Sequence, residues 1–310
     1  MSTAIARTSC PLAAMLADIK IAHSVFALPF AVLAAVMAGW PPAGSGVAAV
    51  SSGVFVGMIV LIVAAMVTAR TAAMLSNRIF DRAIDARNPR TASRPLASGA
   101  ASLSNYIFAI ATASVLFLGI ASSFWFLYGN PYPVLLAVPV LAWICAYGLF
   151  KRYTAWCHVW LGASLAMSVP AAAVAINPDA VRVEPSLWLL AGMVLCWVAG
   201  FDMIYALQDV AVDRAEGLYS MPSRRGVSGA LWLSCVLHVV AVTLLTLVWW
   251  MDPRLGWVFL VGVVAVAALL TVEHATVHTW GTSRMALTFF TLNGVVSCLL
   301  GFTGVVDILV

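Results

Sequence analysis

Long apolar runs are the feature of this sequence that most restricts its fold. Of its 310 residues, 63% are hydrophobic and only 9% are charged, whereas about one quarter of the residues of a soluble domain are charged. The mean hydropathy is +1.02. Soluble globular proteins, disordered chains and nucleic-acid-binding proteins all need more polar surface than this composition provides. The sequence therefore predicts an integral membrane protein that contacts the lipid bilayer and binds no nucleic acid.

Nine segments are long and apolar enough to cross a bilayer as helices, each of which needs about 20 mainly apolar residues. These segments lie near residues 21–40, 47–69, 105–127, 133–150, 157–177, 187–206, 228–250, 256–273 and 285–306. Short connections containing Pro and Gly separate several of them, and no long polar stretch remains for a soluble domain. We therefore expect one all-α domain over residues 1–310, with nine transmembrane helices in a bundle.

Basic residues are concentrated on one side of the predicted spans. All 16 Lys and Arg residues except Arg182 and Arg254 lie on that side. Positively charged connections remain in the cytoplasm. The pattern therefore predicts that the amino-terminal segment 1–19 and the charged connections are cytoplasmic, in a bacterial-type inner membrane. No obligatory protein partner is indicated.

The first acidic motif, residues 77–85, has two aspartates four positions apart. On a helix Asn77, Asp81 and Asp85 share one face, and the two carboxylates on adjacent turns repel each other. Mg²⁺ relieves such repulsion when it bridges carboxylates to phosphate oxygens. The alternative is a solvated helix end, with the aspartates paired to neighbouring arginines. This motif by itself favours neither interpretation.

A second acidic motif, residues 202–213, follows a very apolar stretch. Asp209 and Asp213 repeat the spacing of four, and Asp202 lies nearly two helical turns earlier. Charged groups near membrane depth are costly and are generally functional. Two such motifs on one side of a bundle, both accompanied by arginines, indicate a site for a metal-bound polyphosphate. An ion-coupled transporter is the alternative of another class, but it favours acids at the bilayer midplane.

The histidines have simpler explanations. His274 and His278 are four apart, but they lack a nearby third ligand, so a metal site there is disfavoured. We expect His23, His158 and His238 to be packing or interfacial residues.

Five sequence blocks together resemble one known family. They are residues 77–85, 90–99, 147–154, 162–170 and 205–213. In this order they resemble the UbiA superfamily of intramembrane prenyltransferases, and most of all its 4-hydroxybenzoate polyprenyltransferase branch. The resemblance implies a nine-helix bundle around a central cavity. It also implies Mg²⁺-dependent transfer of a polyprenyl group from polyprenyl diphosphate to an aromatic acceptor in ubiquinone or menaquinone biosynthesis.

The same resemblance implies roles for individual residues. The carboxylates that would bind Mg²⁺-diphosphate are Asp81, Asp85, Asp209 and Asp213, assisted by Asp202. The basic groups that would bind the diphosphate are Arg94, Lys151 and Lys20. The residues near the acceptor would be Arg70 and Asn77. Two tyrosines, Tyr147 and Tyr205, are placed to face the allylic cation, because an aromatic face attracts a cation.

One residue departs from the family pattern. Arg78 stands where many members have an aspartate directly after the motif's asparagine. Together with Glu216-Gly217-Leu218, this Asn-Arg pair resembles prenyltransferases of the futalosine route to menaquinone. The predicted acceptor is therefore 4-hydroxybenzoate, with a futalosine-route menaquinone precursor as the alternative.

Overall fold

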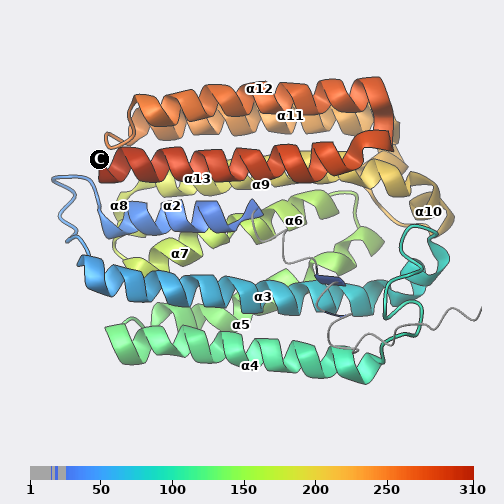
Figure 1. Cartoon of the computed structure of the whole chain (residues 1–310), viewed down its shortest axis with the longest axis horizontal. Helices are drawn as coiled ribbons and strands as arrows, with labels where there is room; N and C mark the ends of the chain where they lie inside the picture. Colours follow the sequence, from blue (N-terminus) through green and yellow to red (C-terminus); the bar gives the residue numbers. More distant parts are fainter. Residues whose placement is uncertain (1–14, 16–17, 20–25) are drawn as a thin grey trace, which may run out of the picture.

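A computed structural model describes residue 15, residues 18–19 and residues 26–310 of the chain. Within this part the chain forms helices and no strand (Figure 1). The predicted diphosphate ligand Lys20, like His23 and most of segment 1–19, lies outside the described residues. The longer elements are α2 (Leu28–Gly39), α3 (Ser52–Arg87), α4 (Leu103–Tyr128), α5 (Tyr132–Ala146), α6 (Cys157–Ala166), α7 (Ser168–Ile176), α9 (Pro185–Tyr205), α11 (Met221–Met251), α12 (Trp257–Trp280) and α13 (Asn293–Leu309). The short ones are η2 (Tyr147–Arg152), α8 (Ala180–Val183), η3 (Ala206–Asp209), α10 (Val210–Ala215), η4 (Gly281–Arg284) and η5 (Ala286–Leu292).

The predicted bundle of membrane helices is confirmed. Among the described residues, eight helical stretches are long and apolar enough to cross a membrane. They are 52–87, 103–128, 132–152, 157–176, 185–215, 221–251, 257–284 and 286–309. The first predicted span, 21–40, is described only in part, as the 12-residue helix α2. Of the nine predicted spans, the described residues therefore include eight of full length and part of the first, as the helix α2.

Helix α9 lies at the centre of the bundle. It is the most buried of the eight spans, and it packs against α6 on one side and α11 on the other. Helix α2 packs between α7 and α13, while α3, α4 and α5 form the opposite side of the bundle (Figure 1). The second acidic motif begins near the carboxyl end of α9, so this helix carries Asp202, while Asp209 ends η3 and Asp213 lies on α10.

Helix α3 is much longer than the predicted span 47–69. It has 36 residues, which at 1.5 Å per residue make about 54 Å, against about 30 Å for the hydrocarbon core of a bilayer. The excess lies at its carboxyl end and contains the first acidic motif, so Asp81 and Asp85 are held on rigid helix.

The predicted span 157–177 is broken at Met167, between α6 and α7. Pro170 explains the break, because a proline lacks the amide hydrogen and its ring clashes with the carbonyl four residues earlier. That residue is Ala166, the last of α6.

An ion-pair cluster joins the connections at the end of the bundle opposite the acidic motifs. Arg254 donates to Asp252 Oδ1 over 2.8 Å, to Glu184 Oε2 over 2.5 Å and to the Met37 carbonyl over 2.8 Å. Both carboxylates are buried, and burial raises the pKa of the Glu184 carboxyl although Arg254 opposes the shift. One guanidinium therefore ties the end of α2 to the segments before α9 and after α11.

We expect Arg254→Ala to lower the free energy of unfolding by about 3–5 kcal/mol, since it leaves two buried carboxylates without their cation. Thermal unfolding of the purified protein in detergent measures this loss. Arg182→Ala is the matched control, because Arg182 is exposed at the same end of the bundle. Equal melting temperatures for the two variants would contradict the prediction.

Candidate active site

Asp81 and Asp85 are buried at the end of α3, with 4% and 6% of their surfaces exposed. Asp81 accepts a hydrogen bond from Lys151 Nζ over 2.6 Å, and Arg152 Nη2 lies 3.4 Å from its other oxygen. Both basic residues belong to the short helix η2, which follows α5. The tight turn of η2 thus brings two cations to a carboxylate about 70 positions earlier in the chain.

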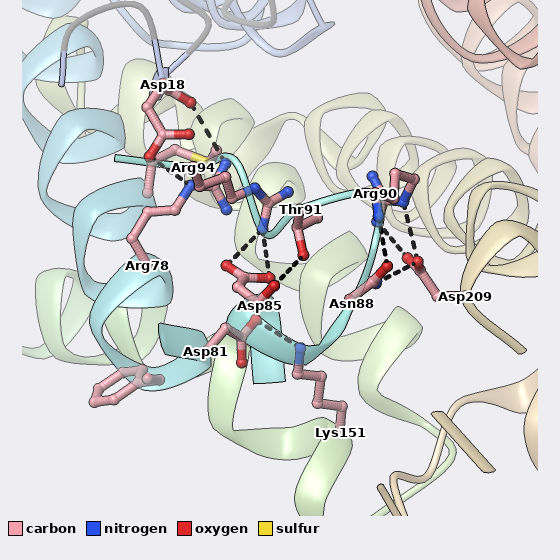
Figure 2. A network of polar contacts seen from close by, with 12 residues as sticks. Asp18, Arg78, Asp81, Asp85, Asn88, Arg90, Thr91, Arg94, Lys151 and Asp209 are labelled. Atoms are coloured by element: carbon pink, nitrogen blue, oxygen red, sulfur yellow. Dashed lines mark hydrogen bonds and ion pairs between the residues drawn. The ribbon is translucent and has the colours of Figure 1, made fainter. Parts of the chain in front are cut away.

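The connection after α3 folds back over the same carboxylates (Figure 2). Arg94 Nη1 lies 2.8 and 2.7 Å from the two oxygens of Asp85. The Thr91 hydroxyl donates to the Asp85 carbonyl over 3.1 Å. The Asn88 side chain accepts from the Arg90 amide over 3.0 Å, a local turn that starts the connection.

Asp209 of the second motif is bound by the same connection. Asn88 Nδ2 donates to its Oδ1 over 2.9 Å, and Arg90 donates to both of its oxygens, with an Nε–Oδ1 distance of 3.0 Å. Burial opposes the charge of Arg90, but the hydrogen bonds and the charge of Asp209 outweigh it and raise the pKa of the guanidinium. Arg90 also donates to the Tyr205 hydroxyl over 3.2 Å. Arg90 and Arg94 thus link the two acidic motifs through one connection.

The other two aspartates of the second motif lie in different surroundings. Asp213 is buried on α10, where the charges of Lys151 and Asp209 act on it. Asp202 lies near the end of α9 and contacts His158 of α6, with 2.7 Å between Oδ2 and Nδ1.

Arg78, the residue that departs from the family pattern, is buried and bound to the amino-terminal segment. Its Nε donates to Asp18 Oδ2 over 3.1 Å, and the Tyr106 hydroxyl donates to the same oxygen over 3.1 Å. Both members of the ion pair have side chains that are 8% exposed. Arg78 therefore pairs with Asp18, in contrast to the predicted alternative in which it neutralises the acidic motif (Figure 2).

An apolar cavity of about 410 Å³ begins beside this polar network. Most of its lining residues belong to α3, α4, α5, α6 and α7. Arg70 and Tyr147 line it, and so does Ser168, just after the break between α6 and α7. Within the described part of the chain, Arg70 Nε and Ser168 Oγ are buried without a hydrogen-bond partner. The cavity thus offers polar groups to a ligand on otherwise apolar walls, the usual composition of a small-molecule site.

The helix η2 connects the cavity to the ion pairs. Tyr147, its first residue, lines the cavity, and Lys151 near its end binds Asp81. Between them Gly148 lies against α3, where an added Cβ would be only 2.1 Å from Asn77 Oδ1. Asn77 is thereby placed between the cavity wall and the acidic motif.

Most of the predicted site residues thus lie around one end of the bundle. Asp81, Asp85, Asp209, Arg94 and Lys151 form ion pairs there, and their roles in binding stay predictions. Sequence reasoning missed Asn88 and Arg90, through which the connection after α3 binds Asp209, and it missed Arg152, the second cation beside Asp81. The spacing of four between Arg90 and Arg94 is a signal that could have indicated Arg90.

The carboxylates fit a magnesium ion only if a ligand completes its coordination. Among the described residues, no three acidic, histidine or cysteine side chains lie close enough to hold one ion. Mg²⁺ is commonly held by one or two carboxylates together with phosphate oxygens and water. The hard oxygen donors of Asp81 and Asp85, and of Asp209 and Asp213, suit that arrangement.

Comparisons with known proteins show the family of this chain. Residues 39–295 match the UbiA prenyltransferase family. A 4-hydroxybenzoate octaprenyltransferase of Chromohalobacter salexigens is 30% identical over 226 residues, which are 72% of this chain and 71% of that protein.

Solved structures give the same fold. A UbiA homologue from Aeropyrum pernix K1 has a TM-score of 0.78 and 32% identity, covering 94% of this chain and 99% of its own. A UbiA homologue from Archaeoglobus fulgidus bound to DMAPP and Mg²⁺ has a TM-score of 0.67 and 16% identity, covering 95% and 98%.

We expect Gly148→Ala to destabilise the protein by about 1–3 kcal/mol, because its methyl group would push Asn77 and α3 away from η2. Thermal unfolding measures the effect. Gly119→Ala, in an exposed part of α4 with no atom within 4 Å of an added Cβ, is the control and should be about 0.5–1 kcal/mol more stable than the unchanged protein. An unchanged melting temperature for Gly148→Ala would show that η2 and α3 are not tightly packed at Asn77.

Proposed function

The chain belongs to the UbiA prenyltransferase family, and from this we propose that it transfers a polyprenyl group from polyprenyl diphosphate to 4-hydroxybenzoate in quinone biosynthesis. The observation that carries the proposal is the juxtaposition of two environments. Paired carboxylates and basic side chains lie at one end of the bundle, and an apolar cavity containing an arginine begins beside them. The first environment suits a metal-bound diphosphate, and the second suits an aromatic acid.

Diphosphate binding would use groups that are already in place. Lys151 and Arg94 neutralise Asp81 and Asp85, and the same cations can bind diphosphate oxygens when Mg²⁺ takes their place on the carboxylates. Arg90 stands in the same relation to Asp209. Bound Mg²⁺ would neutralise the charge that grows on the departing pyrophosphate. Lys20 is proposed as a further diphosphate ligand on the resemblance alone.

The chemistry proceeds by cleavage of the bond between the prenyl C1 and the diphosphate oxygen. The electron pair leaves with pyrophosphate, and Lys151 and Arg94 stabilise that charge. The aromatic faces of Tyr147 and Tyr205 stabilise the remaining allylic cation, a contribution of about 0.5–2 kcal/mol. A ring carbon of the acceptor then forms the new bond, and the ring loses a proton.

Arg70 supports an acceptor that carries a carboxylate. A guanidinium binds a carboxylate through two parallel hydrogen bonds, and Arg70 Nε is buried without a partner in the described part of the chain. Asn77 lies two helical turns further on the same helix. A second acceptor, a futalosine-route menaquinone precursor, is proposed on the resemblance of the Asn77-Arg78 pair to prenyltransferases of that route.

The remaining proposals concern placement. We propose one functional domain over residues 1–310, in a bacterial-type inner membrane with the acidic motifs on the cytoplasmic side. The asymmetry of Lys and Arg supports this orientation. Since the chain belongs to a prenyltransferase family, the transporter alternative has no further support.

We expect Asp81→Asn to lower the rate of Mg²⁺-dependent pyrophosphate release by at least about 100-fold, because it removes a metal ligand and leaves Lys151 unpaired. The assay supplies purified protein with Mg²⁺, a polyprenyl diphosphate and 4-hydroxybenzoate. Mass spectrometry identifies the prenylated product. Chelation of the metal should abolish product formation by the unchanged protein.

Asp179→Asn, at the opposite end of the bundle and exposed, is the control for this experiment and should keep full activity. Undiminished release by Asp81→Asn would overturn the metal assignment. Product from a futalosine-route precursor but not from 4-hydroxybenzoate would show that the precursor is the acceptor. The proposed type of reaction, prenyl transfer, would be unchanged.

We expect Arg70→Met to raise the KM for the aromatic acceptor about 10- to 100-fold, since it removes charge-assisted hydrogen bonds to the carboxylate. The KM for the prenyl diphosphate should change less than about twofold. Initial rates with each substrate varied in turn separate the two constants. Arg82→Met is the control, because Arg82 is exposed on the same helix. A rise confined to the diphosphate KM would assign Arg70 to the other substrate.

A further inference from the structure

His158, which the sequence predicts to be a packing residue, makes two directed polar contacts. It lies in the first turn of α6 with 3% of its surface exposed. Its Nδ1 is 2.7 Å from Asp202 Oδ2, and its Nε2 accepts from the backbone amide of Met221 over 3.1 Å. The imidazole therefore bridges α9 to the first residue of α11.

The contact with Met221 fixes the tautomer of the ring. A backbone amide can only donate, so Nε2 must carry the lone pair. The ring proton is then on Nδ1, where it donates to the carboxylate of Asp202. Such a bond to an ionised oxygen stabilises the charge and holds the carboxylate in one orientation.

The amide of Met221 has no partner within its own helix, because the first amides of a helix never do. Ser220 and Ser223 form a reciprocal cap at the same end, and the His158 ring completes it. The preceding residue Tyr219 donates its amide to the Lys151 carbonyl over 2.7 Å. The cap of α11 is thus connected to both Asp202 and the backbone of Lys151.

The Asp202 side chain remains partly accessible although His158 binds its carboxylate. The side chain is 21% exposed, and Asp202 lies three positions before Tyr205, the last residue of α9 and one of the two tyrosines proposed to face the allylic cation. A carboxylate held at this end of α9 would add negative charge where the positive charge of the allylic cation develops.

We propose that His158 is a positioning residue for prenyl transfer, which holds the Asp202 carboxylate toward the reaction site through its Nδ1 proton while the Met221 amide fixes its tautomer. The inference rests on the proposed function. It assigns the catalytic contribution to the Nδ1 contact and only stability to the Nε2 contact.

Two amide variants separate these contacts. The Asn amide occupies the place of Nδ1, so His158→Asn can still donate to Asp202 but loses the Met221 contact. The longer Gln amide reaches the place of Nε2, so His158→Gln can still accept from Met221 but loses the donor to Asp202. We expect kcat of His158→Gln to fall about 10- to 100-fold, the usual effect of losing a hydrogen bond to a charged group. His158→Asn should lose less than about fivefold in kcat and show the lower melting temperature.

The same pair of substitutions at His278, an exposed histidine, is the control and should change neither quantity. In an Asp202→Asn background, His158→Gln should cause no further loss of kcat, because the two residues act as one unit. A kcat that follows the melting temperature, or that falls equally in the Asn and Gln variants, would overturn the inference. An unchanged protein that forms no prenylated product would instead overturn the proposed function, so the two failures are distinguishable.

Discussion

The pairing of buried aspartates with basic side chains at the end of α3 is the interaction on which the rest of this end of the bundle depends. Two carboxylates on adjacent helical turns are costly to bury, and each needs a cation at close range. Asp81 takes its cation from η2 and Asp85 from the connection after α3. Charge pairing with these aspartates therefore positions both η2 and the connection after α3.

The two ends of the bundle use ion pairs in different ways. At one end Arg254 binds two buried carboxylates and two backbone carbonyls together in one largely buried cluster. At the other end Asp85, Asp81 and Asp209 pair with Arg94, Lys151 and Arg90, whose side chains are 22–34% exposed. Pairs of partly exposed cations can exchange partners when an anion arrives. The buried cluster around Arg254 suits a structural role, and the partly exposed pairs at the other end suit a binding site.

Apolar length and acidic spacing predicted most of the fold and indicated the end of the bundle where the acidic residues gather. They did so because spans are set by local composition, and because Asp81 and Asp85 share a face on any helix. The contacts across the bundle could not be predicted in the same way. Asp209 binds Arg90, 119 positions earlier, and His158 binds Asp202, 44 positions later. Such pairs depend on how the helices pack against one another, and the spacing of residues within one segment does not predict that packing.

The helix η2 shows how one short element can serve both halves of the proposed reaction. Its tyrosine reaches the apolar cavity and its lysine reaches the acidic motif, with Gly148 allowing close approach to α3 between them. The polar head of a prenyl diphosphate and its apolar chain need opposite environments only a few ångströms apart. A cavity inside a membrane bundle, bordered by ion pairs at the end of its longest helix, provides both. In the proposed reaction, the extension of α3 beyond the bilayer core holds the carboxylates of Asp81 and Asp85 beside that cavity.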